Sequence, residues 1–465
     1  MLVGLSLAGL AAVRTARAED LRIADVSIVD VASGRLVSNQ TVDVAGDRIL
    51  WRGPASGAPA RAGVRVINAA DQYLVPGLWD MHVHAHREDR SDSFYPLFVA
   101  HGVLGIREMG SHLAELLASR ARWRAELVAP RVLWGTPALD GTPQILRHGL
   151  GVQTAGGGRA LVRLLADLGF DFVKVYDRLP RETYEAIVDE ARLRGLPVVG
   201  HVPLSSSPAR AATLGQRSIE HVTLVLETCI PGAIERANQN ARGDSMELLT
   251  DGWLSSRLAS FSAPACAVLF EEFRRQAVWQ TPTLVQLRGF AGARELAGID
   301  DPRLALMRPS VREEWRQFGR ELSPEVATAA QAILEQHGRL VLAMSRADVG
   351  ILAGTDASSE PFVFPGESLH TELELLAAAG LEPIAALRTA TLNPRTYRRG
   401  GSPEEPIRAG EEADLLLLRG NPLKSISATR EIAAVILRGR LFDRRALDEL
   451  LRQGKERAEQ AGPEH

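Results

Sequence analysis

Apolar and polar residues alternate with a period of two near both ends of the chain. The pattern covers residues 21–31 (LRIADVSIVDV) and 42–53 (VDVAGDRILWRG), and it returns at 413–423 and 432–443. This alternation, interrupted by turn-forming residues, predicts strands with one buried face. We therefore expect a small β-sandwich domain that is built from both chain ends, with residues 19–73 and 403–445 as its two parts.

Between these ends, short apolar runs alternate with patterns that are typical of helices. Residues 158–169 and 180–195 have the helical periodicity. Eight apolar runs are candidate strands: 73–84, 101–110, 130–138, 170–177, 196–203, 217–225, 278–286 and 348–358. Eight strands that alternate with helices predict an α/β fold, a (β/α)8 TIM barrel over residues 74–402, whose active site lies at the carboxyl ends of the strands.

Three further segments complete the expected organisation. Residues 227–278 are polar and helical in pattern, and we expect them to form a lid insertion over the mouth of the barrel. Residues 446–465 are expected to form a C-terminal helix and tail. Residues 1–18 contain a short apolar stretch that ends in Ala-Arg-Ala, which predicts a signal peptide. A secreted or periplasmic protein is therefore expected, and a cytoplasmic one is the alternative.

The composition excludes some classes of partner. The net charge is −3, and no basic run with interleaved aromatic residues is present, so nucleic acid is not an expected partner. The apolar leader is too short to cross a bilayer, and no later segment is long and apolar enough. A small molecule or a dipeptide is the expected partner, and a homo-oligomer is possible. Cys229 and Cys266 are the two cysteines, and they permit one disulfide without requiring it.

Potential metal ligands follow the predicted strands. His82 and His84 in DMHVH lie two residues apart, so on a strand both imidazoles point to the same side. His201, His221 and Asp356 each come directly after an apolar run. Five nitrogen or oxygen ligands at the carboxyl ends of four strands of one barrel predict a site for zinc or a similar divalent metal.

The lysine usage suggests that this site holds two ions. Lysine plus arginine total 54, yet lysine occurs only at Lys174, Lys424 and Lys455. The five ligands exceed what one catalytic ion usually takes. A neutral lysine amine can react with carbon dioxide to form a carbamate, whose two oxygens can bridge two metals, whereas arginine stays protonated and offers no acceptor. We therefore expect Lys174 to be carboxylated, while a solvated surface lysine is the alternative.

The motifs resemble a known family. GLWDMHVH, VKVY, VVGHVP, SIEH, AGTDAS and ADLLLLRGNPL are similar to those of the metal-dependent amidohydrolase superfamily, in its imidazolonepropionase-like and prolidase-like branch. The resemblance covers nearly all of the chain after residue 18. It implies that His82, His84 and Asp356 hold one metal, that His201 and His221 hold the other, and that Lys174 bridges them. The resemblance thus implies six metal ligands in all: His82, His84, Lys174, His201, His221 and Asp356. Imidazolonepropionases proper use a single metal and have no such lysine, so Lys174 favours the binuclear, peptidase-like relatives.

This set of ligands implies hydrolysis. We expect a hydroxide between the two metals to attack a carbonyl, with Asp356 as general base and then general acid. The expected substrate is a dipeptide or an N-acyl amino acid with a scissile C–N bond. A lactone or cyclic-amide hydrolase on the same site is an alternative, and so is a catalytically silent binding protein. Candidate substrate contacts are Tyr176, which has the parity of Lys174, His148, which resembles a family substrate-binding histidine, and Arg147, which could hold a carboxylate.

Overall fold

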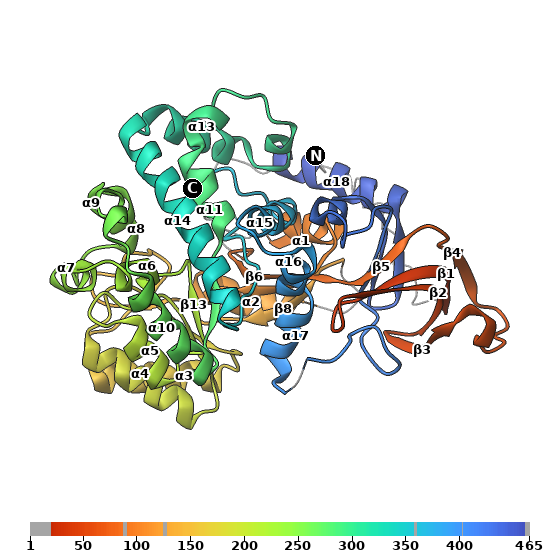
Figure 1. Cartoon of the computed structure of the whole chain (residues 1–465), viewed down its shortest axis with the longest axis horizontal. Coiled ribbons are helices and arrows are strands. Elements are labelled where there is room, and N and C mark those ends of the chain that lie inside the picture. Colours follow the sequence, from red (N-terminus) through yellow and green to blue (C-terminus); the bar gives the residue numbers. More distant parts are fainter. Residues whose placement is uncertain (1–19, 87–90, 124–127, 358–359, 402, 461–465) are drawn as a thin grey trace, which may run out of the picture.

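The computed structural model describes residues 20–86, 91–123, 128–357, 360–401 and 403–460. The expected signal peptide at residues 1–18 therefore lies outside the described residues. Strands lie toward one end of the molecule, and most of the helices surround a second group of strands (Figure 1). Within the described ranges, no helix combines the length and the apolar character that crossing a bilayer requires.

Strands from both chain ends form one sheet. Its members are β1 (Leu21–Asp30), β2 (Arg35–Ala45), β3 (Arg48–Pro54), β4 (Arg65–Asn68), β5 (Tyr73–Pro76), β15 (Leu415–Leu418), β16 (Ile432–Leu437) and β17 (Arg440–Asp443). The order is β17-β16-β15-β5-β1-β2-β3, and β4 pairs with β1. The antiparallel pair β5–β15 joins the two ends of the chain. The alternating apolar residues, such as Leu21, Ile23 and Val42, are buried in a core of their own, so the pattern at both ends predicted this pairing surface.

The expected strand at residues 73–84 divides into two, which corrects the prediction. Its first part, β5, belongs to the sheet of the chain ends, and its second part, β6 (Leu78–Val83), belongs to the inner strands. Gly77 separates them, and a Cβ at this position would come within 2.7 Å of the Leu104 side chain. The chain thus passes from one sheet to the other at a point where the neighbouring packing leaves room only for glycine.

The inner strands are parallel to one another. β6 pairs with β7 (Val103–Glu108), which pairs with β8 (Arg131–Trp134). A second sheet has the order β10-β9-β11-β12-β13-β14. Its strands are β9 (Leu139–Asp140), β10 (Leu150–Gly151), β11 (Val173–Val175), β12 (Val198–Gly200), β13 (Ser218–Glu220) and β14 (Trp279–Thr281). Single parallel bridges connect the two groups: Gly135 with Phe172, Gln280 with Ile351, and Val83 with Ala357.

The segment expected as the last strand, residues 348–358, is less regular than predicted. Ile351 forms one bridge, and the residues after it continue as irregular backbone as far as Asp356. Asp356 has a φ of 63°, in the left-handed region. This conformation cannot continue a strand, because a strand needs a φ near −120°.

Helices follow the inner strands. Those before residue 220 are α1 (Ser91–Ala100), α2 (Leu113–Arg122), α3 (Ala155–Asp167), α4 (Arg181–Leu193) and α5 (Pro208–Leu214). Those after residue 282 include α11 (Leu284–Ala291), α13 (Pro309–Glu321), α14 (Pro324–Arg346), α15 (Glu367–Ala378), α16 (Pro383–Ala390) and α17 (Leu392–Arg399). The two helices expected from periodicity correspond to α3 and α4. Thr154 caps α3 by accepting a hydrogen bond from Gly157 N, and Val162 and Leu165 form part of its buried face.

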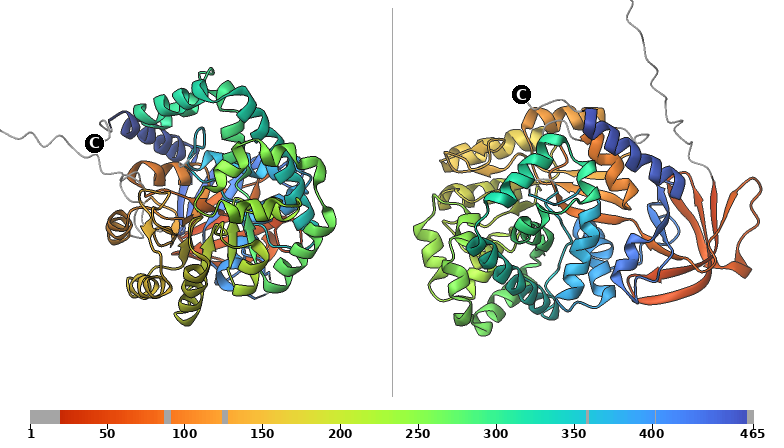
Figure 2. Two further views of the ribbon diagram at one scale, coloured as in Figure 1. Left: turned by 90° about the vertical axis from the view of Figure 1, so that its left-hand side faces the viewer. Right: turned by 90° about the horizontal axis from the view of Figure 1, so that it is seen from above.

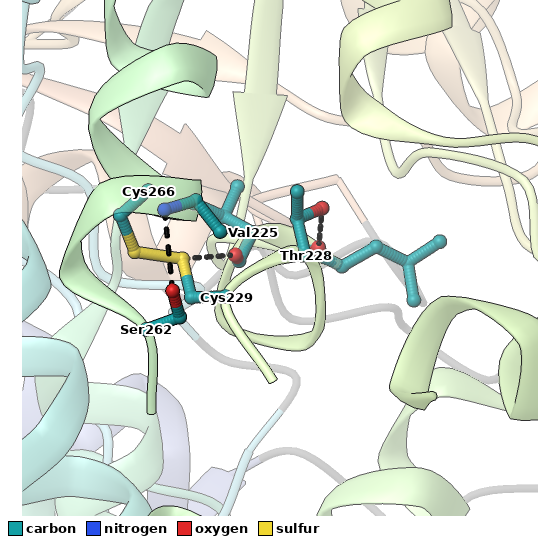
Figure 3. Close-up of a disulfide and its surroundings, with 7 residues drawn as sticks. Val225, Thr228, Cys229, Ser262 and Cys266 are labelled. Atoms are coloured by element: carbon teal, nitrogen blue, oxygen red, sulfur yellow. Dashed lines mark hydrogen bonds between the residues drawn. A yellow bond between two sulfur atoms is a disulfide. The ribbon is translucent and has the colours of Figure 1, made fainter. Parts of the chain in front are cut away.

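The segment expected as a lid is made of short helices. They are α6 (Val225–Thr228), α7 (Ala233–Gln239), α8 (Ser245–Thr250), α9 (Trp253–Ser256) and α10 (Ala263–Gln276). These helices lie at the end of the molecule that is remote from the sheet of the chain ends (Figure 1). A disulfide joins Cys229, directly after α6, to Cys266 in α10, with the two Cα atoms 5.1 Å apart (Figure 3).

The last helix, α18 (Arg444–Gln460), returns along the molecule and packs against α1 (Figure 2). Its Leu447 and Leu450 are buried. The expectation of a C-terminal helix is met over these residues, and residues 461–465 lie outside the described part of the chain.

Candidate metal centre

The six predicted ligands come from five segments and meet at one end of the inner strands. His82 is in β6 and His84 directly follows it, Lys174 is in β11, His201 follows β12 and His221 follows β13. Asp356 lies in the irregular segment after Ile351. All but His221 are at most 4 % exposed, and His221 is half-buried. The carboxyl ends of parallel strands therefore bring these side chains together, as expected.

The first group of ligands is tightly clustered. Ligand atoms of His82, His84 and Asp356 all lie within 4.8 Å of one another. Asp356 Oδ1 is 3.5 Å from His82 Nε2 and 3.2 Å from His84 Nε2. His82 Nε2 and Asp356 Oδ1 are buried, and neither forms a hydrogen bond within the described chain. Since unpaired buried polar atoms are costly, this donor set fits a bound divalent metal.

The second group lies beside the first. The His221 ring centroid is 4.5 Å from that of His82 and 5.0 Å from that of His201. Lys174 is close enough to raise the electrostatic cost of protonating both His82 and His221. Burial lowers the pKa of Lys174 to about 8 despite the nearby Asp356 and Glu220 carboxylates. About a tenth of the amine is therefore neutral at pH 7 and about half at pH 8, and the neutral form is the one that can be carboxylated.

Protonation states in the centre favour metal binding. Burial, followed by the charge on neighbouring groups, lowers the pKa of His82 well below its ordinary value and that of His221 to about 3. Burial alone would raise the pKa of Asp356, but the adjacent His84, His221 and Lys174 lower it to about 2. The imidazoles of His82 and His221 are thus neutral and the Asp356 carboxylate is ionised, which are the forms that ligate metals.

Each ligand histidine is oriented through Nδ1. His82 Nδ1 lies 3.0 Å from Glu220 Oε2, His84 Nδ1 2.7 Å from Gly110 O, His201 Nδ1 2.7 Å from Asp177 Oδ1, and His221 Nδ1 2.7 Å from Thr283 Oγ1. Carbonyl and carboxylate oxygens can only accept, so in three of the four pairs the proton is on Nδ1. This leaves Nε2 as the nitrogen with a free lone pair, an arrangement typical of metal-binding histidines.

A buried ion pair between Arg107 and Glu220 helps to fix the orientation of His82. Arg107 Nη2 donates to Glu220 Oε2 over 2.7 Å, and Arg107 Nη1 donates to Ser218 Oγ and to Tyr397 Oη. Ser218 Oγ donates to Glu220 Oε1. These hydrogen bonds hold Glu220 in position beside His82.

The backbone holds two of the ligands in left-handed conformations. His221 has a φ of 57° and Asp356 a φ of 63°. Such conformations cost about 1–3 kcal/mol for residues with a side chain and are found mainly at functional sites. Here they turn both side chains toward the cluster.

The predicted substrate contacts have different surroundings. Tyr176 lines a pocket beside the metal centre, and its ring lies 4.0 Å from that of His201. His148 is buried, 6.2 Å from the His84 ring and 5.8 Å from the His112 ring. Arg147 is exposed and is absent from the described residues that line this pocket.

Sequence reasoning missed the residues that orient the ligands. Asp177 directly follows Tyr176, and Glu220 directly precedes His221. Because both carboxylates lie at predicted strand ends, the sequence could have identified them as hydrogen-bond partners of the site histidines. Gly110 and Thr283 act through a carbonyl and a hydroxyl, and nothing in the sequence distinguishes them from other loop residues.

A pocket opens beside the centre, and its volume of about 620 Å³ includes the solvent at its mouth. His201, His221 and Asp356 line it together with Tyr176, and Glu227 and His337 line it as well. The candidate metal centre is therefore open to a ligand on this side.

Comparison with known proteins agrees with this geometry. No protein-family model matches the chain. The structure of a bottromycin amidohydrolase superposes with a TM-score of 0.74 and 26% identity over 96% of this chain and 92% of that one. The similar structures are members of the amidohydrolase superfamily, the family that the sequence motifs resemble. A putative prolidase from Bifidobacterium longum shares the fold, with a TM-score of 0.66 and 21% identity over 94% of this chain and 99% of that one.

Among curated sequences, the chain is 30% identical to an adenine deaminase of Cenarchaeum symbiosum over 171 residues. The match covers 37% of this chain and 22% of the deaminase, so the chain spans about a fifth of that relative's length. A Rhizobium meliloti adenine deaminase is 37% identical over 65 residues, which are 14% of this chain and 11% of that one. The mixed α/β content of the present structure is that of its superfamily neighbours.

Proposed function

We propose that this chain is a metal-dependent hydrolase of carbon–nitrogen bonds with a binuclear centre. One observation carries the proposal: four histidines, each oriented through Nδ1, converge with Asp356 and a buried lysine at the ends of the inner strands. The names of the similar structures, which include an amidohydrolase and a putative prolidase, support hydrolysis at such a bond.

The proposed architecture is a (β/α)8 barrel that carries the centre, with a β-sandwich domain from the chain ends and a lid formed by α6–α10. His82, His84 and Asp356 would hold one ion, and His201 and His221 the other. Lys174, as a carbamate, would offer an oxygen to each. Zinc suits this set of imidazole and carboxylate donors. When bound, the ions would supply a water acidic enough to lose its proton near neutral pH.

The chain's own groups perform the proton transfers. Asp356 is ionised, so it accepts a proton from the attacking water and returns it to the leaving amine. The buried walls of the pocket limit competing water, and Tyr176 is placed to contact the substrate. A dipeptide or an N-acyl amino acid is the proposed substrate, and lactones and cyclic amides are the alternative for the same centre.

A second reaction on the same site, deamination, is favoured by the adenine deaminase matches. It would use the same attack at a carbon bonded to nitrogen, with ammonia as the leaving group. Aminopurines therefore belong in the substrate panel.

The disulfide supports a location outside the reducing cytosol. Disulfides form and persist in secreted and periplasmic proteins, and Cys229 and Cys266 are joined and buried in this structure. A secreted or periplasmic protein is therefore proposed.

A hydrolysis panel tests the proposed function. The protein, loaded with zinc in the presence of bicarbonate, is assayed against dipeptides, N-acyl amino acids, lactones, cyclic amides and adenine. Asp356→Asn should lower kcat by roughly 100-fold or more, because it removes the proton acceptor. Asp300→Asn, at an exposed position, is the matched control and should keep full activity. An Asp356→Asn protein with full activity would show that the base is wrongly assigned.

A further inference from the structure

The pocket contains a buried carboxylate that the proposed reaction does not use. Glu227, in the short helix α6, is 5 % exposed and lines the same pocket as His201, His221 and Asp356. Its charge is therefore held close to the place where the substrate must lie.

Glu227 has no counter-ion within the described ranges. Its carboxylate accepts a hydrogen bond from its own backbone N–H, and no described arginine or lysine pairs with it. Burial, with a smaller contribution from Asp177, raises the pKa of Glu227 to about 7. A buried carboxylate without a cation is costly, and a positive ligand group would remove that cost.

His337 is a second buried polar group in this pocket without a partner. It lies in α14 and is 3 % exposed, and its Nε2 forms no hydrogen bond within the described chain. Burial lowers the pKa of His337 to about 4, so the ring is neutral near pH 7. It therefore leaves the charge of Glu227 uncompensated, but it can accept a hydrogen bond from a ligand N–H group.

No lysine or arginine is among the described residues that line the pocket. Of its carboxylates, Asp356 is already assigned to the metal centre, and Glu227 lies apart from the proposed ligands. A substrate carboxylate would meet no basic side chain here, whereas an ammonium or guanidinium could pair with Glu227. This disfavours the expected role of Arg147 as a carboxylate clamp, since Arg147 does not line the pocket.

The position of Glu227 is fixed from outside the pocket. α6 ends at Cys229, whose disulfide ties it to Cys266 in α10 (Figure 3). Cys229 O also accepts a hydrogen bond of 2.7 Å from Ser262 N. With its helix held at this end, Glu227 cannot readily swing out to solvent, and a preorganised carboxylate binds a cation at a lower entropic cost.

We propose that Glu227 is a specificity residue that binds a positively charged group of the substrate, an ammonium or a guanidinium. The inference rests on the proposed hydrolase function and narrows it to basic peptides or amides, with His337 accepting a hydrogen bond from the same group.

Matched neutral and charged ligands test this inference. Ala-Arg is compared with Ala-citrulline, and Arg-Ala with citrulline-Ala, because citrulline is nearly isosteric with arginine and uncharged. A comparison of Ala-Ala with N-acetyl-Ala-Ala reports on the α-ammonium. In the wild-type protein, the kcat/KM should be roughly 10- to 100-fold higher for the charged member of one pair. Glu227→Gln should abolish that preference, so that the charged and the neutral member of the pair are hydrolysed with equal kcat/KM.

Glu235→Gln is the control, because it removes the same charge from an exposed position in α7; its preference should equal that of the wild type. Equal rates on charged and neutral members in the wild-type protein would overturn the inference while the hydrolase function stands.

If no substrate is hydrolysed, the proposed function fails and binding decides the inference separately. Calorimetric titration of the zinc-loaded wild-type protein with L-arginine and with L-citrulline needs no variant and no turnover. Tighter binding of arginine, by roughly 10-fold or more, would support the cation site. Binding of neither would overturn it. Equal affinities would also overturn it if N-acetyl-L-citrulline, which lacks the α-ammonium, bound equally well.

Discussion

Lys174 is the residue on which the two-ion proposal depends. Its amine is buried beside Asp356 and Glu220, and its pKa is lowered to about 8. Lys174→Arg keeps a positive charge but cannot form a carbamate. We expect this variant to lose at least one of two bound ions and to lower kcat/KM by roughly 100-fold or more. Elemental analysis of metal per chain, together with the rate on the best substrate, measures both effects.

Lys424→Arg provides the matched control at an exposed position. It should retain the metal content and the rate of the wild type. In Lys174→Ala, added formate or acetate should restore part of the metal content, because a free carboxylate can supply the missing oxygens. Two ions and full activity in Lys174→Arg would contradict the carbamate.

Glu227 predicts a pH dependence of ligand binding. Its pKa is about 7 without a cation, and a bound cation must lower it. The arginine-to-citrulline affinity ratio should therefore be highest above pH 7 and fall as the pH drops below it. Other titratable groups line the same pocket: Tyr176, His201, His221, His337, Asp356 and Glu360. Calorimetry from pH 5.5 to 8.5 measures the ratio, and taking a ratio cancels effects common to both ligands. The same decline in Glu227→Gln would assign it to another group.

Glu372 makes a separate prediction about stability. Its Oε2 accepts a hydrogen bond from Val285 N, its Oε1 has no partner within the described chain, and burial raises its pKa to about 8. The folded state thus holds the proton more tightly than the unfolded chain. This contribution to stability is complete below about pH 4.5 and is lost as the pH rises through about 8, by up to about 1.4 kcal/mol per pH unit.

Glu372→Gln should therefore flatten the decline in the free energy of unfolding between pH 5.5 and 8.5. Urea titration at three pH values measures it. Glu335→Gln, which changes an exposed glutamate in α14, should follow the wild-type curve. Identical slopes for Glu372→Gln and the wild type would show that Glu372 does not retain its proton.

Residues whose side-chain type suits metal binding could be proposed from the sequence, whereas residues whose proposed role depends on their position in the fold could not. The sequence singled out His82, His201 and Lys174 because few residue types ligate metals and each follows or ends an apolar run. Glu227 offered no such signal, because a glutamate in a polar helical segment is ordinarily exposed. Its burial results from packing between α6, α10 and α14, which no local pattern records.

At the scale of elements, the disulfide connects the lid segment to the pocket. Removing it with Cys229→Ala and Cys266→Ala together should lower the free energy of unfolding by about 2–4 kcal/mol. Because α6 carries Glu227, the double variant should also bind a charged substrate more weakly. The fold-increase in KM should therefore be larger than the fold-decrease in kcat. Thermal or urea denaturation and steady-state kinetics measure the two effects.

Reduction of the wild-type protein with tris(2-carboxyethyl)phosphine, which lacks the zinc-chelating thiols of dithiothreitol, should reproduce the phenotype of the double variant and leave the variant itself unchanged. Unaltered stability and KM in both cases would show that neighbouring packing, rather than the bond, holds α6.

Periodicity predicted most inner strands and helices, but it could not show where one sheet ends and another begins. Residues 73–84 read as one strand because the apolar run is nearly continuous. The division at Gly77 depends on Leu104, which belongs to a different strand. The segment around Asp356 also departs from a strand. Its left-handed backbone at Asp356 turns the carboxylate toward His82 and His84, which are distant in the sequence, so no local pattern predicts it.

At the scale of the whole molecule, the centre gathers ligands from five segments between residues 82 and 356. Bound ions would therefore cross-link most of the inner strands. Because ligands that bind only the folded state stabilise it, removing the ions with a chelator should lower Tm by several degrees. Zinc with bicarbonate should restore it, and differential scanning fluorimetry follows both steps. A Tm that is insensitive to the chelator would count against ions in the folded protein.

The pairing of β5 with β15 also constrains the order in which the protein can be made. More than three hundred residues separate Pro76 from Leu415, its partner in that ladder. During synthesis, the first strands leave the ribosome long before the strand that completes their sheet exists. Throughout that interval β5 presents an unpaired edge, which is the kind of surface that recruits other chains into aggregates. We therefore expect chaperones to bind nascent chains that stop short of residue 415 more than chains that extend beyond residue 418, because only the longer chains can cover this edge.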